Sequence, residues 1–233
     1  MRIFWFMEHL LAMEAEAKCL LTPSERSFER RVMEELKRIL EEAEFLFGPR
    51  DRSFELREPL VSECFTANVI VYPFRFARIY LSSKAKTDPF VASYDLSHEA
   101  IHVLGPEYAL APTVLEEGLA TYFSLRYMNR VYGLGWRKTF DAKYDAAMDA
   151  VSTLLAKNEF VIKELRARQP VISKIDERLL VEVAGIESGL AKFLSADFQS
   201  YGQEASSWTE RAADGAQLFA NGFRSIWDQW KSA

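Results

Sequence analysis

The sequence predicts an α+β protein that is mainly α, with a small β-sheet and a helical C-terminal part. Three observations lead to this prediction. Apolar residues recur at three- and four-residue spacing through most of the 233 residues, short β-branched and aromatic runs fall within residues 65–81, and no repeat or low-complexity tract interrupts the chain. This length fits a single domain over residues 1–233, with N-terminal helices in 1–50, the sheet and two central helices in 60–130, and the helical part in 131–233.

The N-terminal part predicts two helices. The first stretch, to about Ala17, has helical periodicity, and Thr22-Pro23-Ser24-Glu25 resembles a capping box that opens a second helix. We expect this helix to run to Phe47, because Gly48-Pro49 follows. Its apolar residues form one stripe: Phe28, Val32, Leu36, Ile39, Leu40, Ala43 and Phe47.

Two short strands are expected next, at residues 65–72 and 76–81, separated by Pro73. A helix over residues 94–104 follows them. A second central helix then begins with Pro112 in its first turn, and its apolar residues recur at mixed three- and four-residue intervals. Beyond these elements the pattern is almost wholly helical, with one long segment at 140–168, another at 170–198 and a last one at 208–230.

The most informative motif is His98-Glu99-Ala100-Ile101-His102. A spacing of four residues advances about 400° around a helix, so both imidazoles lie on one face, one turn apart. Such a pair can bind zinc, while the carboxylate beside the first ligand reaches a water molecule on the metal. The alternative is an ordinary helix with two half-buried histidines. The chain has only three histidines, and the residues around the pair are apolar, so the zinc site is favoured.

The third ligand separates two classes of zinc site. The metzincin pattern places a glycine three residues after the second histidine and a further ligand three residues later. Gly105 is present, but Tyr108 occupies the ligand position and no histidine follows His102. We therefore interpret Gly105-Pro106 as a helix stop with the glycine in a left-handed cap. The remaining candidates are the carboxylates of Glu116 and Glu117, between which local geometry does not choose.

The segment Glu116-Glu117-Gly118-Leu119-Ala120 resembles the Asn-Glu-Gly-Phe-Ala element of the aminopeptidase-N-like group of gluzincin metallopeptidases. The resemblance covers about residues 78–125 and implies a zincin-like catalytic core that holds one Zn²⁺ through His98, His102 and Glu117. Two features differ: the usual asparagine is Glu116, and only 15 positions separate His102 from Glu117, which suggests a compact relative.

Neighbouring residues have open roles in this scheme. Glu116 is an alternative ligand, an acceptor behind a ligand histidine, or an anion at the helix N-terminus. Thr121 is a candidate partner of a ligand histidine or an ordinary helix threonine. The small residues Gly118 and Ala120 are expected to let the two central helices approach closely.

These residues predict a zinc-dependent metallopeptidase. Zinc lowers the pKa of a bound water molecule from about 15.7 to about 7, and Glu99 is expected to act as general base during attack on a peptide carbonyl. Two alternatives are a zinc hydrolase of a non-peptide amide and a zincin-fold interaction protein that has lost catalysis. A second group to stabilise the oxyanion is left open. The candidates are His9, Tyr122, Tyr144 and Tyr201.

The expected partner is a peptide or protein substrate. In zincins an edge strand beside the metal pairs with extended substrate, and the resemblance makes residues 78–82 the candidate strand. For an aminopeptidase, Glu63, Glu107 or Glu116 would hold the free amine. Whether cleavage is internal or terminal, and the oligomeric state, stay open.

Composition argues against other classes of partner. The formal net charge is −5, and basic residues alternate with acidic ones, so no nucleic-acid surface is expected. Cys19 and Cys64 form no metal or redox motif. Glu8 and His9 interrupt the apolar run that begins at Ile3, which argues against a signal peptide or a membrane span. We expect a cytoplasmic protein.

Overall fold

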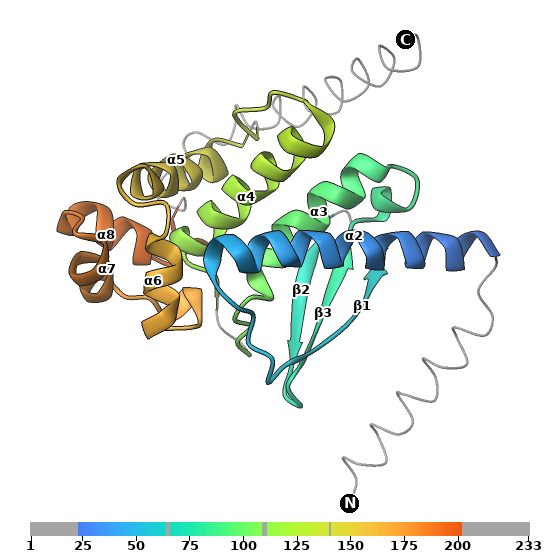
Figure 1. Cartoon of the computed structure of the whole chain (residues 1–233), viewed down its shortest axis with the longest axis horizontal. Coiled ribbons are helices and arrows are strands. Elements are labelled where there is room, and N and C mark those ends of the chain that lie inside the picture. Colours follow the sequence, from blue (N-terminus) through green and yellow to red (C-terminus); the bar gives the residue numbers. More distant parts are fainter. Residues whose placement is uncertain (1–22, 64–65, 109–110, 140, 202–233) are drawn as a thin grey trace, which may run out of the picture.

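A three-stranded sheet lies against a set of packed helices (Figure 1), in a computed structural model that describes residues 23–63, 66–108, 111–139 and 141–201. These residues form seven α-helices and the one sheet, which confirms an α+β, mainly helical fold. The predicted helices before Ala17 and at 208–230 lie outside the described residues. No described helix is both long and apolar enough to cross a bilayer.

The sheet has the strand order β1-β3-β2, with β1 (Glu55–Val61), β2 (Asn68–Tyr72) and β3 (Phe76–Leu81). Strand β3 pairs in parallel with β1 and antiparallel with β2. As the central strand, β3 buries Ala77, Ile79 and Leu81 against the helices. The strand expected at 76–81 is thus confirmed, whereas the strand expected at 65–72 begins at Asn68.

Strand β1 was not predicted. The strand contains three charged residues and Pro59, residue types that are depleted in strands, and its burial does not alternate. The register with β3 shifts between Arg57 and Leu60, so the proline falls at an irregularity of an edge strand.

The long helix α2 (Pro23–Phe47) has the predicted bounds and buries the predicted stripe at Val32, Leu36, Ile39, Ala43 and Phe47. It packs against β1 and against α3 (Pro89–His102), which in turn contacts β2 and β3. Helix α4 (Val114–Tyr132) lies between α3 and α5 (Ala142–Lys157), as Figure 1 shows. The pair of central helices is therefore enclosed by the sheet with α2 on one side and by the C-terminal helices on the other.

The C-terminal part is more broken than predicted. The expected helix at 140–168 divides into α5 and α6 (Val161–Arg168), because the Asn158 side chain accepts a hydrogen bond from Phe160 N and holds a turn. The expected helix at 170–198 divides into the 3₁₀ turn η2 (Ile172–Lys174), α7 (Glu177–Ala184) and α8 (Ser188–Ser195). Asp176 caps the start of α7, and Gly185 ends it at φ +58°.

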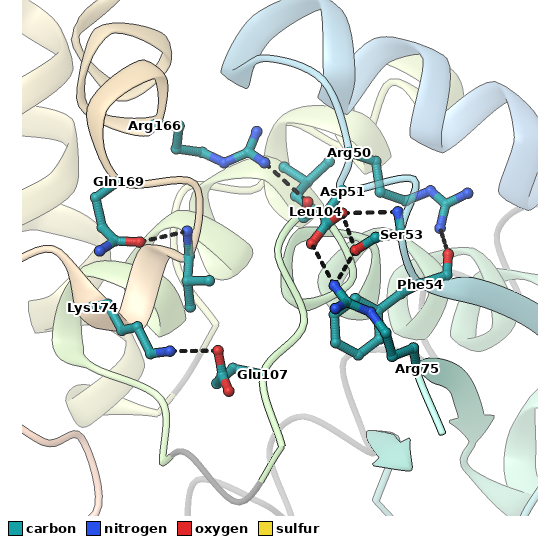
Figure 2. A network of polar contacts seen from close by, with 11 residues as sticks. Arg50, Asp51, Ser53, Phe54, Arg75, Leu104, Glu107, Arg166, Gln169 and Lys174 are labelled. Atoms are coloured by element: carbon teal, nitrogen blue, oxygen red, sulfur yellow. Dashed lines mark hydrogen bonds and ion pairs between the residues drawn. The ribbon is translucent and has the colours of Figure 1, made fainter. Parts of the chain in front are cut away.

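Arg166 joins this C-terminal part to the end of α3. It is buried, and its five N–H groups donate to five backbone carbonyls, those of Phe47, Gly48, Pro49, Leu104 and Pro170. Figure 2 shows the bond to Leu104, two residues beyond the last residue of α3. One cation thus satisfies carbonyls at the C-terminal ends of α2 and α3, where a positive charge is favoured.

Candidate metal centre

Helix α3 supplies the two histidines. Asp88 caps its N-terminus by accepting hydrogen bonds from Phe90 N and Val91 N, and Pro89 occupies the first turn. The face formed by Leu96, Ala100 and Ile101 is buried in the core. His98 and His102 lie on the opposite face, with 13% and 14% of their side chains exposed. The helix extends further towards the N-terminus than expected and ends at His102.

Helix α4 supplies the carboxylates. It begins at Val114 with Thr113 as its cap, so Pro112 lies just before the helix and not in its first turn. Glu116 and Glu117 occupy the first turn, where negative charge is favoured by the helix dipole. Backbone hydrogen bonds from Phe198 N to Pro112 O and from Val114 N to Ala196 O hold this helix start against the end of α8.

The structure brings the three predicted ligands together. Nε2 of His98 lies 3.2 Å from Oε2 of Glu117, and Nε2 of His102 lies 3.8 Å from Oε1 of the same carboxylate. One ligand atom from each of the three residues lies within 4.8 Å of the others. Tetrahedral zinc with bonds of about 2.0–2.1 Å requires ligand atoms roughly 3.3 Å apart. Imidazole nitrogens and a carboxylate oxygen are ligand types that zinc accepts.

The outer nitrogens of the two imidazoles have different surroundings. Nδ1 of His102 lies 2.9 Å from Oε1 of Glu116, whose other oxygen accepts a hydrogen bond from Ser173 Oγ in η2. Nδ1 of His98 is buried and has no hydrogen-bond partner within the described part of the chain. Glu116 thus contacts a histidine from behind, which matches one of the three roles considered for it.

Burial and the clustered charges shift the acidities of this site. Burial raises the pKa of Glu99, the residue between the histidines. For Glu117 burial acts to raise the pKa, but the His102 and His98 rings lower it overall. For His102 burial acts to lower the pKa, whereas the Glu117 charge and the Glu116 hydrogen bond raise it to about 10. A metal ion bound at Nε2 of His102 would therefore have to displace a proton from the same imidazole.

Of the groups considered for oxyanion stabilisation, Tyr144 on α5 lies at the site. Its ring packs edge-on to His98 with centroids 6.0 Å apart, and it lines the same cleft as the three predicted ligands. Its hydroxyl makes no hydrogen bond to the residues that the structure describes, and burial followed by the Glu117 charge raises its pKa, so it stays a donor. Tyr122 and Tyr201 pack against the core away from this cleft, and His9 lies outside the described residues.

The predicted ligands His98, His102 and Glu117 line a cleft of about 600 Å³. Strand β2 forms one wall through residues 68–71, and Pro112, Val171, Ser173 and Gln199 contribute to the remaining lining. The strand expected to bind substrate, residues 78–82, is wrong as an edge: β3 is central, and β2 is the edge strand on this side. The error arises because the antiparallel β2–β3 pair looks the same in sequence whichever strand is outermost.

The acidic residues considered for holding an amine are distributed differently. Glu107 and Glu116 line the cleft, but Glu63 does not. Glu107 forms an ion pair with Lys174, which Figure 2 shows bridging the loop after α3 and η2. Glu107 is paired with Lys174, and Glu116 contacts His102 and Ser173, so neither is an unpaired anion available for an amine.

Two local predictions, those for Gly105 and Gly118, need correction. Gly105 does not have a positive φ; it is required because a Cβ there would lie 2.5 Å from the Pro170 carbonyl oxygen. Gly118 permits the close approach of α5 rather than α3, because a Cβ there would lie 2.4 Å from Ala147 O. For Thr121 the second of the two interpretations agrees with the structure: its hydroxyl donates to the Glu117 carbonyl at 2.8 Å, as an ordinary helix threonine does.

Comparisons of the chain with protein-family models, curated proteins and solved structures find no match.

Proposed function

We propose that the protein is a zinc-dependent metallopeptidase with a zincin-like catalytic core, in which His98, His102 and Glu117 hold one Zn²⁺ and Glu99 is the general base. The observation that carries the proposal is the convergence of two imidazole nitrogens and one carboxylate, from α3 and α4, at spacings compatible with tetrahedral zinc. Three protein ligands leave one coordination position open, as in catalytic rather than structural zinc sites.

A zinc ion bound there would supply Lewis-acid polarisation of the substrate carbonyl and a water molecule of lowered pKa. Glu99 lines the same cleft and is the carboxylate next to the first ligand. As the base it takes a proton from the attacking water molecule and delivers it to the leaving amine. Burial supports this role, because it raises the pKa of Glu99 towards the range in which a carboxyl both accepts and returns a proton.

Tyr144 is the second electrophile in this proposal. Its phenol lines the cleft beside His98, and its hydroxyl is unengaged within the described residues. The O–H group would donate to the oxygen on which negative charge develops as the carbonyl is attacked. Of the three candidate tyrosines, all within the described residues, Tyr144 is the one that lines the cleft beside the proposed ligands.

Strand β2 supports a peptide substrate. It is an edge strand whose residues 68–71 line the cleft, and no described strand pairs with its outer side. An extended peptide would add to this edge through backbone hydrogen bonds, leaving specificity to side-chain pockets. The half-buried side chains of Val69 and Val71 make part of that wall apolar.

The test combines metal content with hydrolysis. Inductively coupled plasma mass spectrometry should find one zinc ion per chain in the purified protein. The same protein should cleave members of a mixed fluorogenic peptide library. Glu99→Gln should keep the metal and lose most of the turnover, because general base catalysis contributes about 10²- to 10⁴-fold. Zinc with turnover of simple amides only would favour a non-peptide hydrolase. Zinc without any turnover in either protein would favour an interaction protein, and absence of zinc would refute the proposal.

A further inference from the structure

A chain of hydrogen bonds runs from η2 to one of the proposed metal ligands. Ser173 Oγ donates to Oε2 of Glu116, and Oε1 of the same carboxylate lies 2.9 Å from Nδ1 of His102. Both carboxylate oxygens are therefore engaged, one by each neighbour. With Nδ1 turned to Glu116, the Nε2 atom of the same ring faces Glu117 at 3.8 Å.

The donor at the start of this chain is held by well-packed backbone. Arg166 Nε donates to Pro170 O, and the Gln169 side chain accepts from Val171 N, a contact that Figure 2 draws. The Pro170 carbonyl also packs against Gly105, just after α3. Ser173 therefore has a defined position relative to the end of the helix that carries His102.

The hydrogen bond between Ser173 and Glu116 joins two parts of the chain that are distant in sequence. Ser173 lies 57 positions from Glu116 and belongs to the C-terminal helical part, whereas both histidines and Glu117 come from the central helices. The side chains of Glu116 and His102 are 11% and 14% exposed, so their contact is shielded from competing water.

We propose that Ser173 and Glu116 are positioning residues that fix the His102 ring, and that the C-terminal helical part thereby sets the affinity of the centre for its metal. This inference rests on the proposed zinc site. A ligand histidine whose second nitrogen donates to a carboxylate has a fixed orientation and a more basic ligand nitrogen. The serine bond restricts the carboxylate rotamers that would release the ring.

The test measures Zn²⁺ affinity by competition with a chromophoric chelator. Glu116→Gln should weaken binding about 10- to 100-fold, the usual loss for an outer carboxylate. Ser173→Ala should weaken it less, about 3- to 10-fold, and Ser173→Thr, which keeps the hydroxyl, should restore it. The visible spectrum of the Co²⁺-substituted protein should change in Glu116→Gln, because the geometry of His102 at the metal changes.

A matched control comes from the next residue of η2. Lys174→Gln removes the partly exposed ion pair with Glu107, which touches no proposed ligand, and should leave Zn²⁺ affinity within about twofold of wild type. Circular dichroism of each metal-free variant verifies that it is folded.

The double variant separates a connected chain from two independent effects. If Ser173 acts through Glu116, Ser173→Ala combined with Glu116→Gln binds Zn²⁺ about as weakly as Glu116→Gln alone. Fully multiplicative losses, or wild-type affinity of Ser173→Ala, overturn the inference while the proposed function stands. A wild-type protein that binds no Zn²⁺ overturns both.

Discussion

Two adjacent glutamates illustrate how position on a helix divides chemical roles between identical side chains. Consecutive residues of an α-helix point about 100° apart. Glu117 therefore faces the Nε2 atoms of both histidines, whereas Glu116 faces the Nδ1 atom of His102 and Ser173. Their residue type alone does not separate these roles, and neither does their common place in the first turn of α4.

At the residue scale, the proposed role of Tyr144 predicts a specific kinetic effect. Tyr144→Phe removes the hydroxyl but keeps the ring that packs against His98 and Phe198. If that hydroxyl stabilises the developing oxyanion, kcat should fall about 10²- to 10³-fold while zinc content stays at wild-type level. Steady-state kinetics on a cleaved library peptide measure the loss.

Tyr122→Phe is the matched control, because this tyrosine packs against the core and does not line the cleft. Its turnover should equal that of wild type. Equal turnover in Tyr144→Phe would leave oxyanion stabilisation to the metal alone.

At the element scale, close contacts of backbone position α4. Gly118 directly follows the proposed ligand Glu117, and it lies against the backbone of α5, the helix that carries Tyr144. The glycine thus allows α4 and α5, which both contribute residues to the candidate site, to pack closely together.

Gly118→Ala should therefore destabilise the fold despite the better helix propensity of alanine. The new Cβ would lie 2.4 Å from Ala147 O, a backbone atom, so α4 and α5 must separate. Overpacking of this kind costs about 1–3 kcal/mol. Urea unfolding measures the cost. Gly189→Ala in α8, where a Cβ meets nothing within 4 Å, should be neutral or slightly stabilising. An equal effect of the two variants would contradict the close-approach argument.

Arg166 fixes the C-terminal ends of α2 and α3 by hydrogen bonding to their backbone carbonyls. Burial lowers its pKa to about 10, so it remains protonated at neutral pH. Arg166→Met leaves five carbonyls without their donor and should lower the free energy of unfolding by about 3–5 kcal/mol. Thermal and urea denaturation measure this loss.

The control is Arg168→Met, two residues along the same helix. Its ion pair with Glu182 is about half exposed on both sides, so the change should stay within about 0.5 kcal/mol. Similar losses for the two arginines would show that burial of the guanidinium is not what matters.

At the scale of the whole molecule, local signals predicted more than long-range contacts did. The stripe of α2, strand β3 and the facing pair of histidines follow from periodicity, which is a property of one segment. Strand β1, the outer position of β2 and the bond from Ser173 to Glu116 depend on pairings between distant segments. No local pattern encodes them. The breaks in the C-terminal helices did have local signals, in Asn158, Asp176 and Gly185, that periodicity outweighed.

If the proposed zinc site is correct, the coupling of zinc and proton binding gives the whole molecule a pH dependence. The pKa of His102 is about 10 in the fold and about 6.5 in an unfolded chain. Its protonated ring therefore contributes stability that is full below about pH 6.5 and is lost as the pH rises through about 10. Zinc at the proposed site would have to displace this proton, so its apparent affinity should rise up to about tenfold per pH unit below pH 10. The lowered pKa of Glu117 adds no trend near neutral pH, because that carboxylate is already ionised.

The increase in Tm caused by excess Zn²⁺ should consequently be larger at pH 8 than at pH 6. A ligand stabilises the fold by an amount that grows with the logarithm of its free concentration divided by its Kd, and the Kd for zinc is lower at pH 8. Differential scanning fluorimetry of chelator-treated protein measures the shift. Titration calorimetry in buffers of different ionisation enthalpy should count between about one and two protons released per zinc at pH 7, one from His102 and a fraction from the zinc-bound water. Glu117→Gln, which replaces a proposed ligand, should show a much smaller zinc shift at either pH. If the Tm shift is the same at both pH values and calorimetry detects no proton release, the metal does not bind at the His102 ring.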